Sequence, residues 1–111
     1  MEIAEQQTGE ITIVEVKGRI DSNTAIAFGE RLTGLIKAGR ARLVVDLKHI
    51  IYISSAGFRA LLIAGRLAEE RNGTLALCSL SAEVQRLFDL GAFTDLFVIY
   101  PSREEVLNKL S

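Results

Sequence analysis

The chain has 111 residues, of which 49% are hydrophobic and 24% are charged, and this balance is typical of one soluble, folded domain over residues 1–111. A formal net charge of -1 excludes a general electrostatic attraction to nucleic acid or to anionic lipid. A single cysteine, Cys78, excludes an internal disulfide framework.

Neither a secretory leader nor a membrane-spanning run is expected. The first five residues are acidic and contain no apolar stretch. The most apolar window, residues 60–65, is bounded by Arg59 and Arg66 and is too short to cross a bilayer. The sequence therefore predicts a cytoplasmic protein without membrane insertion.

The first elements predicted along the chain are two strands that form a hairpin. A short strand is expected over about residues 3–6, and a turn follows at residues 8–9, Thr-Gly. Residues 11–17 are β-branched and alternate in part between apolar and polar side chains. This pattern predicts a second strand, which is expected to end at Gly18.

A first helix is predicted to follow the possible N-caps at residues 21–24 and to end at residues 38–39. Its inward face repeats with helical spacing and consists of Ala25, Phe28, Leu32, Leu35 and Ile36. Residues 43–47 are then apolar on both faces, which is typical of a strand covered on both sides.

A second helix is predicted to begin near Ala56 and to end at residues 72–73, Asn-Gly, which favour a C-cap. Its apolar stripe consists of Phe58, Leu61, Leu62, Gly65 and Ala68. Residues 75–78 predict another buried strand.

The last part of the chain predicts a helix, a strand and a final helix. The helix covers residues 82–89, and its inward side chains are Val84, Leu87 and Phe88. The strand covers residues 96–100. The final helix begins with a capping box in which Ser102 is paired with Glu105.

The predicted order is therefore β-β-α-β-α-β-α-β-α. Strands that alternate with helices after an initial hairpin are typical of a mainly parallel sheet. We expect an α/β fold with a mixed, mainly parallel sheet of four to five strands and about four helices. In such a sheet residues 18–21 should lie beside residues 52–57, because both segments follow strands at the same end.

Side chains that could catalyse a reaction or hold a metal are scarce. His49 and Cys78 are the only histidine and the only cysteine, whereas a metal site needs several such ligands together. The glycine-rich runs that bind the phosphates of a nucleotide are also missing. We expect no metal, no cofactor and no catalytic residue. Cys78 is expected in the core and His49 in a surface loop.

A serine hydrolase is the enzyme class that comes nearest to the sequence. Residues 55–57, Ser-Ala-Gly, match half of a nucleophile elbow, but Ile53 stands where that motif has a glycine. The serine would also need a base that a third group holds in place, and His49 is the sole candidate. The sequence favours a protein that is not an enzyme.

Ser54 and Ser55 stand between the strand at residues 43–47 and the helix that begins near Ala56. A serine at this place can cap the helix, because its oxygen accepts a hydrogen bond from a free backbone N–H. The free N–H groups and the positive end of the helix dipole also favour a phosphate. The residues alone leave two interpretations, a plain cap or a site for a phosphoryl group.

The order of elements and several segments together resemble the STAS family, specifically the small bacterial anti-sigma-factor antagonists. The resemblance covers essentially the whole chain. The segments that carry it are residues 18–21 (GRID), 44–47 (VVDL), 52–57 (YISSAG) and 81–90 (SAEVQRLFDL).

In that family the phosphorylated serine lies two residues before a glycine, so the resemblance implies Ser55 as the acceptor and Gly57 as the glycine. Ser54 stands where many members have aspartate, and Ala56 stands where some have a second serine. Ser54 is expected to be the helix cap. Asp21 matches an acidic residue that lies close to the phosphorylation site in relatives.

The resemblance implies a partner-switching cycle. Without phosphate, the protein would bind a serine kinase that is also an anti-sigma factor, and so free a sigma factor. The kinase would use its own ATP to phosphorylate Ser55 and end the complex, and a PP2C-type phosphatase would restore binding. No direct contact with nucleic acid is implied. The expected partner-binding surface consists of Asp21, Asn23, Thr24, Ser54, Ser55, Gly57, Phe58 and Arg59.

Two points stay open at this stage. Phe58 is expected in the core, but an exposed Phe58 would be the hydrophobic anchor of the interface. The alternative function is a non-phosphorylated STAS interaction subunit of a membrane transport or sensory (stressosome-like) assembly. The aspartate missing at Ser54 counts for this alternative, and an intact acceptor serine counts against it.

Overall fold

The computed structural model describes residues 1–110, and Ser111, the last residue of the expected domain, lies outside them. The elements in chain order are β1 (Glu2–Thr8), β2 (Ile11–Ile20), α1 (Ala25–Lys37), β3 (Arg42–Ile53), α2 (Ser55–Glu70), β4 (Thr74–Cys78), α3 (Ala82–Leu90), the 3-10 helix η1 (Thr94–Leu96), β5 (Val98–Tyr100) and α4 (Arg103–Leu110). The predicted order of strands and helices is confirmed.

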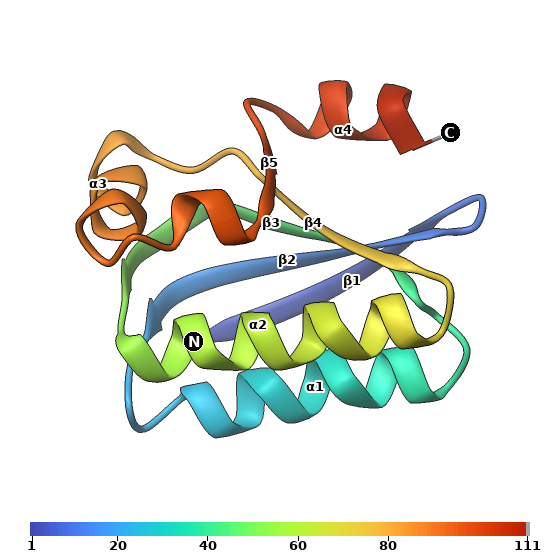
Figure 1. Cartoon of the computed structure of the whole chain (residues 1–111), viewed down its shortest axis with the longest axis horizontal. Coiled ribbons are helices and arrows are strands. Elements are labelled where there is room, and N and C mark those ends of the chain that lie inside the picture. Colours follow the sequence, from blue (N-terminus) through green and yellow to red (C-terminus); the bar gives the residue numbers. More distant parts are fainter. Residues whose placement is uncertain (111) are drawn as a thin grey trace.

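Within residues 1–110, five strands form one sheet in the order β1-β2-β3-β4-β5 (Figure 1). β1 pairs antiparallel with β2, whereas the other neighbouring strands pair in parallel. The predicted α/β class with a mixed, mainly parallel sheet is therefore confirmed. In Figure 1, α1 and α2 lie side by side along one face of the sheet, and α4 lies over the opposite face.

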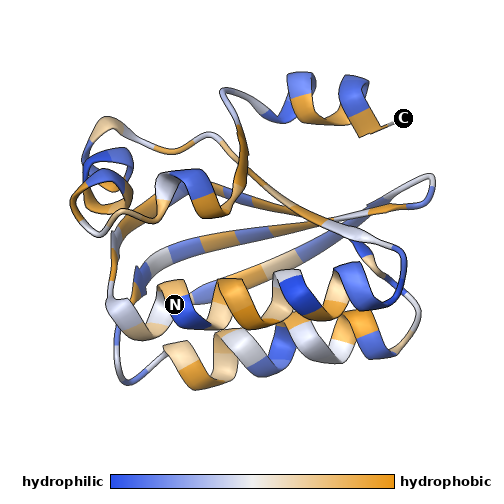
Figure 2. Cartoon of the chain, viewed as in Figure 1, coloured by the Kyte–Doolittle hydropathy of each residue, from blue (hydrophilic) through white to orange (hydrophobic). Residues whose placement is uncertain are grey.

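Two apolar clusters fill the space on the two sides of the sheet. The larger cluster lies under α1, α2 and α3 and includes the fully buried Phe28, Leu61 and Phe88. The smaller cluster lies under α4, where Val106 packs near Cys78 and its neighbours in the sheet. Figure 2 shows that β4 is mostly hydrophobic, whereas hydrophobic and hydrophilic residues alternate along β2 and along the helices. The core placement predicted for Cys78 is confirmed.

β2, which leads to the loop before α1, and β3, which leads to Ser54 and Ser55, are both longer than predicted. β2 does not end at Gly18, which has a φ of +104° that glycine adopts without strain. The strand shifts register there and continues to Ile20. β3 likewise continues past residue 47 to Ile53, because it stays paired with β2. β4 stops opposite Asp46, and the polar residues 48–49 beyond that point face solvent.

His49 therefore lies in a strand rather than in the predicted loop, although its predicted exposure is confirmed. The last strand is shorter than residues 96–100, since Thr94–Leu96 forms the 3-10 helix before it. No helix among residues 1–110 is long and apolar enough to cross a membrane.

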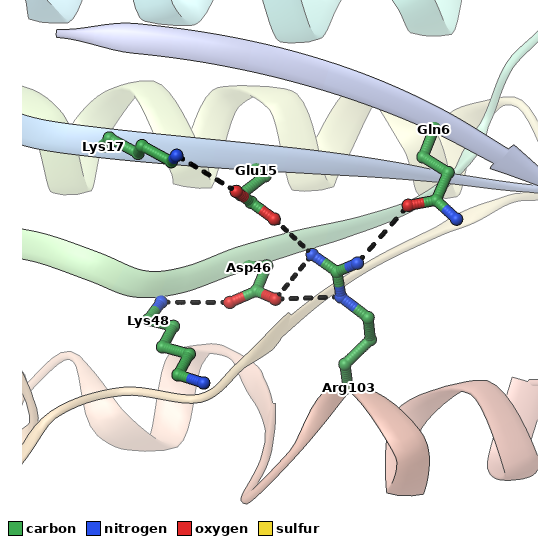
Figure 3. Close-up of polar contacts among 6 residues, drawn as sticks. All are labelled: Gln6, Glu15, Lys17, Asp46, Lys48 and Arg103. Carbon is green, nitrogen blue, oxygen red and sulfur yellow. Dashed lines mark hydrogen bonds and ion pairs between the residues drawn. The ribbon is translucent and has the colours of Figure 1, made fainter.

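A single arginine attaches the first turn of α4 to the sheet (Figure 3). Arg103 donates from Nε to Asp46 Oδ2 at 2.9 Å and from Nη2 to Glu15 Oε2 at 2.7 Å. The other oxygen of Asp46 accepts the Lys48 backbone N–H at 3.0 Å. Burial alone would lower the pKa of Arg103, but the bonds to Asp46 and Glu15 raise it. The buried Asp46 carboxylate is therefore paired on both sides.

Candidate functional site

Two loops meet where β2 and β3 end. The strands are parallel neighbours, so their carboxyl ends lie at one end of the sheet, where Ile20 is in register with Ile53. The backbone N–H of Ser54 donates to the Ile20 carbonyl at 2.8 Å. The loop into α1 and the loop into α2 are thus held together, at the left of Figure 1. The predicted proximity of residues 18–21 and 52–57 is confirmed.

The two adjacent serines do different things at the start of α2. Ser54 is the N-cap, with an extended backbone, and its hydroxyl oxygen accepts the Gly57 N–H at 3.3 Å. Ser55 is the first residue of the helix and its side chain is exposed. Within residues 1–110 the Ser55 hydroxyl has no hydrogen-bond partner. Ser54 satisfies a free N–H of the helix, which leaves the Ser55 hydroxyl available to solvent.

Gly57 allows the first turn of α2 to rest directly on the ends of both strands. A Cβ atom at this position would lie 2.7 Å from Ile20 Cγ2 and 2.7 Å from Ile53 Cγ1. Such distances are too short for non-bonded carbon atoms. The glycine is therefore required by close packing, and it sets where Ser55 stands relative to β2 and β3.

Asp21 organises the neighbouring loop. Its Oδ1 accepts the backbone N–H groups of Asn23 at 2.9 Å and Thr24 at 3.1 Å. The Thr24 hydroxyl donates to the Arg19 carbonyl at 2.9 Å. The N–H of Asn23 is the largest influence on the pKa of the Asp21 carboxyl and holds that pKa below its usual value, with smaller contributions from Thr24 and Arg19. The carboxylate is therefore an ionised part of the loop at neutral pH.

Arg19 and Tyr52 join the two strands at the base of these loops. The Arg19 guanidinium carbon lies 4.6 Å from the centre of the Tyr52 ring, a cation–π contact. Arg19 Nε also lies 3.9 Å from Asp21 Oδ2. This contact was not predicted from the sequence, although Arg19 and Tyr52 lie at the ends of two strands expected to be parallel neighbours, which could have indicated it.

Phe58 does not contribute its ring to the surface. Its side chain is 4% exposed and stacks on Phe93 with ring centres 4.2 Å apart. It also meets Phe88 edge to face at 4.7 Å. The predicted core placement is confirmed, so the inclusion of Phe58 among surface residues is corrected. Gly57 is also buried, and both residues support the surface from below.

The remaining predicted residues gather on one patch, which we call the two-loop surface. It consists of Asp21, Asn23, Thr24, Ser54, Ser55 and Arg59. Arg59 is exposed, one turn along α2 from Ser55, and forms no ion pair within the part of the chain that the structure describes. Arg59 and Ala56 also line an apolar groove between α1 and α2.

The two-loop surface can present a hydroxyl, and its own side chains do not activate that hydroxyl. No described residue forms a hydrogen bond to Ser55 Oγ. His49 lines a cavity with Asp46 and Arg103 instead. A general base must be within hydrogen-bond reach of the proton that it removes. Ser55 Oγ is therefore an exposed hydroxyl without a base within hydrogen-bond reach among the described residues.

Comparisons with known proteins identify relatives over most of the chain. Residues 2–106 match the model of the STAS domain. BtrV of Bordetella bronchiseptica, provisionally described as an anti-sigma factor antagonist, is 33% identical over 89 residues, which are 80% of this chain and 77% of BtrV. The anti-sigma-B factor antagonist of Bacillus subtilis is 31% identical over 91 residues, which are 82% of this chain and 83% of that protein.

Solved structures share the fold at lower sequence identity. A protein of Thermotoga maritima, provisionally described as an anti-sigma factor antagonist, has a TM-score of 0.90 at 16% identity and covers 96% of this chain and 92% of its own. SpoIIAA of Bacillus in its phosphorylated form has a TM-score of 0.74 at 15% identity and covers 99% of this chain and 100% of its own.

Proposed function

This chain belongs to the STAS domain family, and we propose that it is an anti-sigma factor antagonist controlled by phosphorylation of Ser55. In the unphosphorylated form the two-loop surface binds a serine kinase that is also an anti-sigma factor, and a sigma factor is released. A PP2C-type phosphatase reverses the modification. The protein acts in the cytoplasm as a binding module and contributes no catalytic group of its own.

The observation that carries this proposal is that the two adjacent serines have different surroundings. Ser54 caps α2, whereas the hydroxyl of Ser55 is exposed and forms no hydrogen bond within residues 1–110. The relatives named anti-sigma factor antagonists support the role, and a solved phosphorylated form of SpoIIAA supports a phosphoryl group on this fold.

The proposed chemistry is supplied by the partners. The kinase transfers the γ-phosphoryl group of its ATP to Ser55 Oγ, the hydroxyl proton passes to a base of the kinase, and ADP leaves. The phosphatase later hydrolyses the phosphoester with water and releases inorganic phosphate. This chain needs only to present the hydroxyl in a fixed position, which the cap at Ser54 and the packing at Gly57 support.

The charge of the phosphoryl group explains why the complex would dissociate while the domain stays folded. Phosphoserine carries about -1.5 to -2 charges at neutral pH. At the N-terminus of its own helix this charge is favourable by about 0.3–1 kcal/mol. Against a desolvated partner surface it costs several kcal/mol. A cost of about 4 kcal/mol weakens binding nearly a thousandfold, so the effect on the complex exceeds the effect on the fold.

The test combines the purified protein with the anti-sigma kinases of its own cell and ATP, followed by mapping of the modified residue by mass spectrometry. We expect one phosphate on Ser55, none on Ser55→Ala, and a phosphate that still maps to Ser55 in the matched variant Ser54→Ala. Phosphate that persists on Ser55→Ala would refute the assignment of the acceptor.

Binding measurements complete the test. The kinase should bind the parent protein and Ser55→Ala with similar affinity. It should bind Ser55→Asp at least about tenfold more weakly, because the variant adds a negative charge to the interface. The loss should be smaller than with a phosphate, which carries more charge. Equal binding of Ser55→Asp and the parent protein would contradict the cycle. A pull-down that recovers subunits of a transport or sensory assembly and no kinase would favour the non-phosphorylated alternative.

A further inference from the structure

We propose that Arg59 binds the phosphoryl group of phosphoserine 55 within the same chain. This inference rests on the proposed modification of Ser55. Phosphorylation would then change the two-loop surface twice, because it adds an anion at Ser55 and engages the free cation at Arg59. A partner that had met Arg59 with a carboxylate would lose that contact as well.

Helix geometry brings the two side chains together. Ser55 is the first residue of α2 and Arg59 is the fifth, so they are one turn apart on the same side of the helix. Helical side chains lean toward the N-terminus of their helix, and the long Arg59 side chain therefore extends back over the turn that contains Ser55. An acidic group that precedes a basic group by four residues is the favourable orientation of such a pair.

Arg59 is also free to take this role. It is exposed and forms no ion pair among residues 1–110. Its guanidinium can bind a phosphate with two parallel N–H donors. The first turn of α2 contains no acidic residue that would repel the phosphate.

The other charged groups near this end of the sheet are less available. Arg19 lies against the Tyr52 ring and 3.9 Å from Asp21. Asp21 is occupied by the backbone N–H groups of its own loop. Glu30 of α1 lines the same groove as Arg59 but lies beyond ion-pair distance from it. Arg59 is therefore the cation best placed to pair with the phosphate.

The experiment places phosphoserine at position 55 during translation, so it does not depend on any kinase. The second pKa of the phosphate is measured by phosphorus NMR in the otherwise native chain, in Arg59→Gln and in the matched control Arg66→Gln. A neighbouring cation favours the dianion and lowers the pKa. We expect Arg59→Gln to raise the pKa by roughly 0.15–0.4 unit and Arg66→Gln to leave it unchanged, since Arg66 is exposed on α2 two turns further from Ser55.

A third variant, Arg59→Lys, separates charge from geometry. Lysine keeps the charge but lacks the planar pair of donors, so we expect an intermediate pKa. Equal pKa values in the native chain and in Arg59→Gln, or equal shifts in Arg59→Gln and Arg66→Gln, would overturn the inference. Neither result would bear on whether a kinase modifies Ser55, which the mass spectrometry above decides separately.

Discussion

At the residue scale, one of the two neighbouring serines has a structural role and the other is available for modification. Ser54 holds a helix N–H through its hydroxyl, and Ser55 presents its hydroxyl to solvent. The residues alone left both serines as possible caps, and the resemblance to the STAS family predicted Ser54 as the cap and Ser55 as the acceptor. The apolar stripe of the helix predicted Phe58 in the core, but it could not show that Phe93 and Phe88 are the rings that cover it.

Substitution of the two serines should therefore affect stability differently. Ser54→Ala removes the N-cap and should lower the free energy of unfolding by about 1 kcal/mol. Ser55→Ala loses no hydrogen bond and should stay within about 0.5 kcal/mol of the parent protein. Urea unfolding of both variants checks the difference. A larger loss for Ser55→Ala than for Ser54→Ala would show that the cap is assigned to the wrong serine.

Asp21 should give the loop before α1 a dependence on pH. Its pKa is lowered in the folded protein, chiefly by the Asn23 N–H, so its ionised form contributes stability above its unfolded pKa, and this contribution is lost as the pH falls through the folded value. Asp21→Asn should therefore lower the melting temperature at pH 7 and lose this deficit in acid. Melting curves from pH 2 to pH 7 test this, with the exposed Asp95→Asn as control. A deficit that persists at pH 2 would contradict it.

At the element scale, the length of β3 and the position of α4 could not be predicted from the sequence. The polar pair Lys48-His49 suggested a loop. A strand can contain this pair because β4 ends opposite Asp46 and both residues are exposed to solvent. The capping box predicted that a helix follows Ser102, whereas the face on which α4 lies depends on bonds from Arg103 to Asp46 and Glu15, which are distant in sequence.

Loss of Arg103 should loosen α4. Arg103→Met leaves Asp46, whose side chain is 6% exposed, without its main partner. Removal of one member of a buried pair costs about 3–5 kcal/mol, and partial exposure of Arg103 reduces this to about 1–3 kcal/mol.

Cys78 lies under α4, and burial raises the pKa of its thiol. The variant should therefore react faster with a thiol reagent at pH 8.

Lys109→Met is the matched control for this measurement, because Lys109 is an exposed residue of the same helix. It should leave the labelling rate of Cys78 unchanged. Equal labelling rates in Arg103→Met and the parent protein would mean that apolar contacts at Val106 and the hydrogen bond from Arg42 to the Leu110 carbonyl suffice to hold α4 on the sheet.

At the scale of the whole molecule, the site occupies one end of the sheet and the apolar clusters lie on its two faces. A charge added at exposed Ser55 therefore meets no part of the core. The phosphorylated protein should unfold cooperatively, with a free energy within about 1 kcal/mol of the unmodified protein. Denaturant unfolding of the translationally modified chain tests this. Loss of cooperativity would show that the phosphate acts by disrupting the domain.

The sheet is stepped, because β3 runs on to Ile53 while β4 ends opposite Asp46. The projecting part of β3 is paired with β2 alone, and the register shifts between the pairs Gly18–Ile50 and Arg19–Tyr52. Hydrogen exchange along residues 48–53 should consequently be slow for the amides that bond to β2 and fast for those that point away from it. The strand that leads to Ser55 is thus paired along one edge and lacks a paired strand along the other.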